Sequence, residues 1–85
     1  MYGILFSRDA IKVLRRMPQN MARLIRSKID RLAQDPYAPN NNVKKLVGRP
    51  GYRLRVGDWR VIYDLDHGLR ILAVERIAPR GGAYE

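Results

Sequence analysis

The chain contains no cysteine and a single histidine, His67. Without thiols it can form neither disulfide bonds nor a reactive thiolate, which is typical of proteins from the reducing cytoplasm. One histidine is too few for a histidine-rich metal site or a two-histidine acid–base pair, so no cofactor is expected. His67 stands in an Asp-His-Gly segment, and we interpret it as a turn residue.

Long apolar runs are absent as well. No stretch approaches the roughly 20 residues that a membrane-spanning helix requires, and the first ten residues lack the apolar segment of a secretory signal. We therefore expect a cytoplasmic protein with no membrane partner. The 85 residues suffice for one domain, 1–85, with a modest core, and no repeat or low-complexity segment divides them.

Acidic residues are scarce, with eight against 17 lysines and arginines and a formal net charge of +9. This charge favours nucleic acid as the partner, because lysine and arginine neutralise phosphates. An acidic protein is the second candidate and an anionic membrane the third. Thirteen of the 17 basic residues are arginines, which favours forked contacts to phosphate or carboxylate groups.

Two helices joined by almost no linker are expected after a short strand at residues 2–6. Ser7 is placed to cap the first helix, and apolar residues at helical spacing follow it. Pro18 is expected in the first turn of the second helix, which Asp35-Pro36 then ends. The predicted buried stripe of the second helix is Met21, Leu24, Ile25, Ile29 and Leu32.

The most informative stretch is residues 51–64, GYRLRVGDWRVIYD, in which apolar and basic residues alternate. A period of two residues predicts half-buried strands, and the break at Gly57-Asp58 predicts a tight turn between them. Three arginines on such a hairpin repel one another. Their gathering therefore suggests a polyanion that lies across them.

Further strands are expected on both sides of this hairpin, at residues 43–47 and 69–77, the latter reached through a turn at 66–68. The predicted fold class is α+β, in the order β-α-α-β-β-β. The N-terminal strand and the helical hairpin belong to a small, mainly antiparallel sheet, and the helices cover one of its faces. The other face carries the arginines and stays at least partly open.

The segment GYRLRVGDWRVIYDLD, followed after one strand by RIAPRGGAY, closely resembles toxins of the RelE/ParE superfamily, the RelE branch in particular. The resemblance covers nearly the whole chain, and these two segments are its specific part. It implies a RelE-like fold and a toxin of a type II toxin–antitoxin system. Such a toxin is an mRNA interferase, an endoribonuclease that cleaves messenger RNA in the ribosomal A site through attack of the 2′-OH and so inhibits translation.

The resemblance also implies a site. The residues to which it gives catalytic roles are Arg53, Arg55, Arg60, Arg80 and Tyr84. Arg53 and Arg55 would also bind RNA, and Lys44 and Lys45, which precede the hairpin, would extend the track for the phosphates. Known members carry lysines at the positions of Arg53 and Arg55. Arginine stays protonated at any ordinary pH, so this cluster can stabilise charge but cannot supply a base.

RNA cleavage by the 2′-oxygen needs a proton acceptor, stabilisation of a dianionic phosphorane and a proton for the leaving 5′-oxygen. Histidine and glutamate usually move the protons, and this chain has one histidine and two glutamates. An efficient stand-alone ribonuclease is therefore not expected. The arginines suit charge stabilisation, while Tyr84 could stack on a base, orient the 2′-OH or act as a weak acid–base group.

Alternative interpretations remain open at the level of sequence. The arginines could be the solvated face of a hairpin, with Arg60 paired to Asp58 or Asp64. The chain could poison DNA gyrase as ParE-like toxins do, or it could be a non-catalytic basic domain that binds RNA or an antitoxin. The family resemblance implies a cognate acidic antitoxin in a heteromeric complex, besides mRNA and the ribosome.

Overall fold

The computed structural model describes residues 1–80. Its elements, in chain order, are β1 (Gly3–Phe6), α1 (Arg8–Arg16), α2 (Gln19–Gln34), β2 (Val43–Lys45), β3 (Tyr52–Val56), β4 (Trp59–Asp66) and β5 (Ile71–Pro79). The predicted α+β class is confirmed. All five strands expected from the sequence are present, although the predicted order β-α-α-β-β-β counts only four. Neither helix among the described residues is long and apolar enough to cross a membrane.

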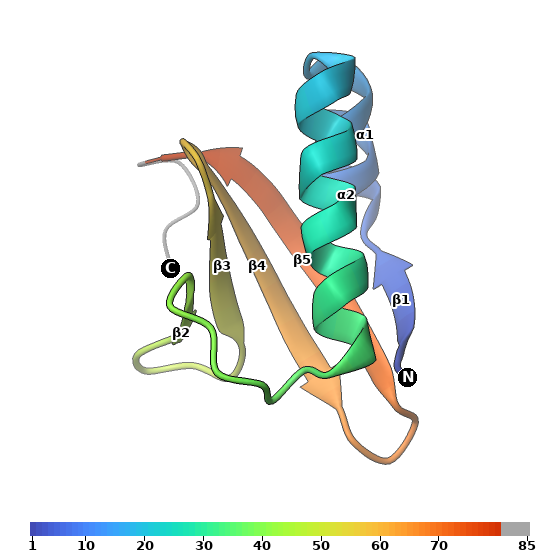
Figure 1. Cartoon of the computed structure of the whole chain (residues 1–85), viewed down its shortest axis with the longest axis vertical. Coiled ribbons are helices and arrows are strands. Elements are labelled where there is room, and N and C mark those ends of the chain that lie inside the picture. Colours follow the sequence, from blue (N-terminus) through green and yellow to red (C-terminus); the bar gives the residue numbers. More distant parts are fainter. Residues whose placement is uncertain (81–85) are drawn as a thin grey trace.

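The five strands form one sheet in the order β1-β5-β4-β3-β2. β1 pairs in parallel with β5, and all other neighbours are antiparallel. β5 begins at Ile71, two residues later than expected, because Arg70 has a φ of 55° and belongs to the preceding turn. Figure 1 shows the two helices side by side along one face of this sheet, with β2 and β3 at the side away from β1.

The first helix begins where its capping residue predicts, and the second begins one residue later than predicted. Ser7 Oγ accepts a hydrogen bond from the backbone N–H of Ala10 at 3.0 Å, and Asp9 lies in the first turn of α1. Pro18 is the N-cap of α2 rather than a residue of its first turn. Two residues therefore separate the helices, as a helical hairpin requires.

The prediction of the buried stripe of α2 is wrong for one residue. Leu24 is 42% exposed, whereas Ala33, which was not predicted, is fully buried. The buried residues of α2 are Ile25, Ile29, Leu32 and Ala33, a spacing of four, three and one. Leu24 lies one position, or about 100° around the helix, from Ile25, and this places it at the margin of the stripe.

The β3–β4 hairpin contributes buried residues from the sheet to the same core. Leu54 and Val56 of β3 and Val61 and Tyr63 of β4 are buried in the cluster that includes the helices, as the alternation predicts. Tyr52 stacks on Tyr63 with ring centroids 5.5 Å apart. Burial raises the pKa of Tyr63, and its hydroxyl finds no hydrogen-bond partner within residues 1–80.

A second, smaller apolar cluster lies on the opposite face of the sheet. Leu46, Ile62 and Ala78 form it, because the chain leaves β2 at Lys45 and folds back instead of continuing as the predicted strand to residue 47. The backbone N–H of Leu46 donates to the carbonyl of Gly51 at 3.0 Å. The loop 46–51 thus covers part of the face that carries the arginines.

Candidate functional site

Four cationic side chains from three strands line one hollow on the open face of the sheet. It has a volume of about 220 Å³ and is lined by Asn41, Asn42, Lys44, Arg53, Arg55 and Arg60. We call it the cation hollow. Its described lining contains amide and cationic side chains but no carboxylate, so the local charge strongly favours an anion.

The strand register explains why these side chains meet. Lys44 of β2 is the partner of Arg53 on β3, and Arg55 is the partner of Arg60 on β4. Residues directly opposite in antiparallel strands project to the same face, with Cβ atoms about 5 Å apart. Like charges therefore face each other twice across β3, and an anion bound between them would reduce the repulsion.

Arg60 is held beside the hairpin turn. Its Nη1 donates to the carbonyl oxygens of Gly57 at 3.2 Å and Trp59 at 3.1 Å. Neither Asp58 nor Asp64, its alternative partners in the sequence, is among these acceptors. Because its hydrogen bonds go to neutral carbonyls, the charge of Arg60 is not neutralised by them.

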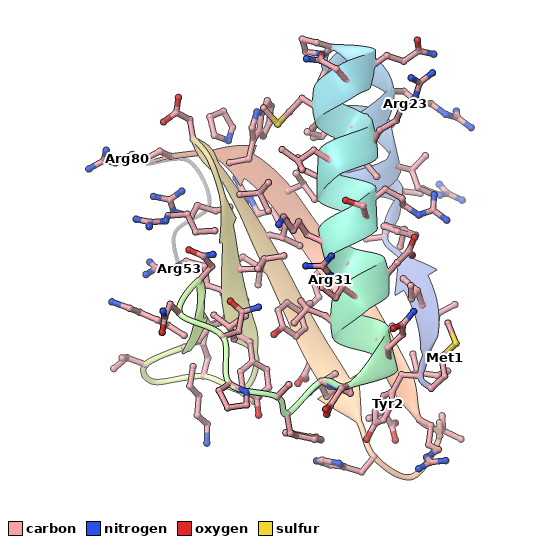
Figure 2. The ribbon with its side chains drawn as sticks, in the orientation of Figure 1. Met1, Tyr2, Arg23, Arg31, Arg53 and Arg80 are labelled. Atoms are coloured by element: carbon pink, nitrogen blue, oxygen red, sulfur yellow. The ribbon has the colours of Figure 1, made fainter. Side chains whose placement is uncertain are left out.

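Arg80 also lies next to the hairpin turn. It is exposed, and its backbone N–H donates to the carbonyl of Asp58 at 2.6 Å. Figure 2 shows Arg53 and Arg80 on the side of the sheet away from α2, while Arg23 projects from the helical pair on the other side. Tyr84, the remaining predicted catalytic residue, lies outside the described residues.

Lys45, which was predicted to bind RNA together with Lys44, Arg53 and Arg55, lies apart from these three residues. Its register partner is Tyr52, whose ring stacks on the core residue Tyr63. Neighbouring residues of a strand project to opposite faces, so Lys45 points away from Lys44 and does not line the cation hollow. Of the two lysines, only Lys44 joins the arginines.

Three residues of this region were not singled out from the sequence. Asn41 and Asn42 line the hollow, although the sequence indicated only a polar loop there. Arg76 is the register partner of Ile62 and so projects to the same face as the Ile62 side chain. Alternation alone does not place Arg76: counting back from the buried Ile77 puts it on this face, but counting on from the buried Val74 does not, because the β4–β5 register shifts between Ile62 and Tyr63.

None of the described residues that line the hollow is a histidine, aspartate or glutamate. His67 is in the β4–β5 turn as predicted, and both its ring nitrogens lie within 2.9 Å of the Tyr37 hydroxyl. Six residues of mostly extended chain, which span roughly 20 Å, separate it from Arg60. Glu75 is engaged elsewhere, since its Oε1 lies 3.6 Å from Nη2 of Arg49 in an ion pair. Within residues 1–80, no three histidine, aspartate or glutamate side chains gather as a metal site would need.

Comparison with known proteins gives a consistent family. Residues 4–84 match the family described as the ParE toxin of type II toxin–antitoxin systems, parDE. The search among curated proteins found no match. Among solved structures, the RelE–RelB complex from the archaeon Pyrococcus horikoshii aligns with 29% identity and a TM-score of 0.81, covering 96% of this chain and 98% of that chain.

Two more distant structures share the fold. The intact E. coli RelBE toxin–antitoxin complex aligns with 20% identity and a TM-score of 0.79, over 93% of this chain and 96% of the other. A YoeB/ParE toxin from Agrobacterium tumefaciens aligns with 15% identity and a TM-score of 0.78, over 92% and 98%. RelE-like and ParE-like proteins thus both superpose on this chain along nearly their full length.

Proposed function

The chain belongs to the ParE toxin family of type II toxin–antitoxin systems, within the RelE/ParE superfamily, and from this membership we propose that it is a ribosome-dependent mRNA endonuclease. In this proposal the toxin cleaves messenger RNA in the A site and arrests translation in the cytoplasm. The observation that supports it best is the cation hollow, in which Lys44, Arg53, Arg55 and Arg60 surround one space.

The proposed chemistry is transesterification. The 2′-oxygen bonds to phosphorus, the bond from phosphorus to the 5′-oxygen breaks, and the products end in a 2′,3′-cyclic phosphate and a 5′-hydroxyl. Negative charge builds on the non-bridging oxygens during this step. The three guanidinium groups of the hollow would stabilise that charge and hold the phosphate in line for attack.

The reaction also needs proton transfer, and the described residues that line the hollow include no histidine or glutamate to carry it out. Tyr84, predicted from the family pattern, is the remaining candidate within the chain, together with water. A catalyst that mainly stabilises charge depends strongly on a well-held substrate. This is why we propose the ribosome as the partner that presents the RNA.

We also propose a cognate acidic antitoxin as partner. The net charge of +9 and the four cationic side chains that line the hollow favour an acidic chain. Solved relatives of this fold include toxins in complex with RelB antitoxins. An antitoxin carboxylate in the hollow would relieve the same repulsion that a phosphate relieves.

A second candidate function is inhibition of DNA gyrase. The matched family is that of ParE, and the described lining of the hollow, which holds no histidine or carboxylate, fits a toxin that acts by binding. This function would not require the cation hollow. The two candidates therefore differ in what they predict for Arg60.

The test adds the purified chain to a reconstituted translation reaction with a defined mRNA and maps new 5′ ends by primer extension. We expect cuts in phase with codons and 5′-hydroxyl ends. Arg60→Ala should slow cleavage by about 10²-fold or more, the usual effect of losing one preorganised donor. Arg16→Ala, which removes an exposed arginine from the last turn of α1, is the matched control and should cleave normally.

A parallel reaction measures DNA supercoiling by purified gyrase. Inhibition there without mRNA cleavage would replace the nuclease proposal by the gyrase one. Retained RNA affinity with neither activity would indicate a non-catalytic binding domain.

A further inference from the structure

A second hollow begins where the cation hollow ends. It lies between the C-terminal half of α2 and the loop at residues 38–42, and its volume is about 370 Å³. Gln34, Asn40 and Asn42 give it three carboxamide groups, so we call it the carboxamide cleft. Two buried leucines, Leu32 and Leu54, contribute apolar surface to its lining.

The two hollows share a wall. Asn42 and Arg55 line both of them. The backbone N–H of Arg55 donates to the carbonyl of Asn42 at 2.8 Å, and the backbone N–H of Asn42 donates to Oδ1 of Asn40, also at 2.8 Å. The loop is therefore tied to β3, and a ligand in one hollow lies next to a ligand in the other.

The chemistry of the cleft differs from that of the cation hollow. Lys28 and Arg31 of α2 contribute positive charge, but Asp35 contributes a carboxylate, which repels an anion. Carboxamides present both N–H donors and a carbonyl acceptor. Figure 2 shows Arg31 on α2 and Arg53 on the far side of β3, so cations stand on both sides of the path that joins the hollows.

A planar base with polar edges has the matching chemistry. RNA-binding proteins recognise unpaired bases by packing the ring against flat or apolar surface and by hydrogen-bonding its edges, often with asparagine or glutamine. The cleft volume lies in the range of small-ligand sites. An acidic peptide would match the cations but not Asp35 and the three carboxamides.

We propose that the carboxamide cleft binds one unpaired RNA base, that of the nucleotide next to the phosphate in the cation hollow. This inference rests on the proposed function and deepens it, because it assigns the choice among RNA sequences to the cleft. The cation hollow binds the backbone, which is the same in every RNA, and the cleft reads the neighbouring base.

The test measures binding directly and needs no cleavage. The probes are a 2′-O-methyl trinucleotide, which lacks the attacking hydroxyl, and the same backbone without its three bases. The full chain should bind the base-bearing probe about tenfold more tightly, the order expected for one stacked and hydrogen-bonded base. Gln34→Ala and Asn42→Ala should abolish most of that ratio. Gln34 lines only the cleft, so Gln34→Ala should also leave affinity for the base-free probe unchanged.

Matched controls stand at the other end of α2. Gln19 and Asn20 are exposed residues of the same types in its first turn, so Gln19→Ala and Asn20→Ala should keep the wild-type ratio. Equal affinity of wild type for the two probes would overturn the proposal, as would a ratio that Gln34→Ala and Asn42→Ala leave intact. A poly-glutamate peptide that binds wild type and is lost in the same two variants, with no base effect, would assign the cleft to an acidic peptide instead.

The outcome is separable from that of the translation assay. A base-dependent ratio in a chain that cuts no mRNA would keep the cleft as a base site and reject the nuclease. Codon-phased cleavage without any base-dependent ratio would do the reverse.

Discussion

Arg55 and Arg60 are directly opposed in the β3–β4 register, so two permanent positive charges face each other across the hairpin. Lys44 and Arg53 repeat the arrangement on the next pair of strands. Opposed like charges destabilise a sheet. The first two predictions concern this repulsion.

Arg55→Gln should raise the free energy of unfolding by about 0.5 kcal/mol at low ionic strength, because it removes one cross-strand repulsion. Urea denaturation at about 0.01 M and at about 1 M salt measures this gain in stability. The gain should shrink at high salt, because salt screens the repulsion between the two arginines. Arg16→Gln, at the C-terminal end of α1, removes a favourable charge–dipole interaction and should give no gain. A loss of stability in Arg55→Gln would contradict the repulsion.

Sulfate should stabilise the fold more than chloride at equal ionic strength, because an anion bound only to the folded state adds to its stability. At ten times its dissociation constant the added stability is about 1.4 kcal/mol, seen as a rise in Tm. Lys44→Gln should weaken this response, whereas Lys45→Gln should not, since Lys45 faces away from the hollow. Equal responses in the two variants would show that the sulfate effect is not local.

Gly51→Ala should destabilise the loop that covers part of the open face. Gly51 has a φ of 111°, and a Cβ there would lie 3.0 Å from the carbonyl oxygen of Tyr63. Strain of this kind costs about 1–3 kcal/mol. Thermal unfolding would measure it, with Gly48→Ala as the control, since a Cβ at Gly48 meets nothing within 4 Å although its φ is also positive. Gly51→Ala should be the more destabilising of the two.

Tyr63→Phe should leave the protein as stable or stabilise it by about 1 kcal/mol, because it removes a buried hydroxyl without a described partner. Burial holds the pKa of Tyr63 above its ordinary value of about 10. The unfolded chain therefore ionises this tyrosine first, and its contribution to stability, full below pH of about 10, declines as pH rises further. Urea denaturation should show a smaller alkaline loss in Tyr63→Phe, and clear destabilisation at neutral pH would indicate a partner for the hydroxyl.

Much of the fold follows from local patterns in the sequence. The cap at Ser7, the break at Gly57 and the alternation around Arg53 and Arg55 depend on neighbours within a few residues, and the structure confirms the elements that they predict. The grouping of Arg53, Arg55 and Arg60 in one hollow follows from the same alternation once the hairpin register is known.

What the sequence did not predict depends on contacts between distant segments. The reversal after Lys45 buries Leu46 against Ile62 and Ala78, and nothing in the segment VKKLV distinguishes this reversal from a longer strand. The carboxamide cleft likewise requires α2 and the loop at 38–42 to be placed against β3. Periodicity carries no information on such placements.

The parallel pairing of β1 with β5 joins residues 3–6 to residues 71–74, and this has a consequence for the order of synthesis. A ribosome releases the N-terminal strand first, but β1 has no neighbour until β5 has left the exit tunnel. β5 also brings Leu72, Val74 and Ile77 to the core. We therefore expect that no nascent chain from which β5 is still missing has a complete sheet behind the cation hollow, and that the ribosome making the toxin does not meet this domain folded before β5 has emerged.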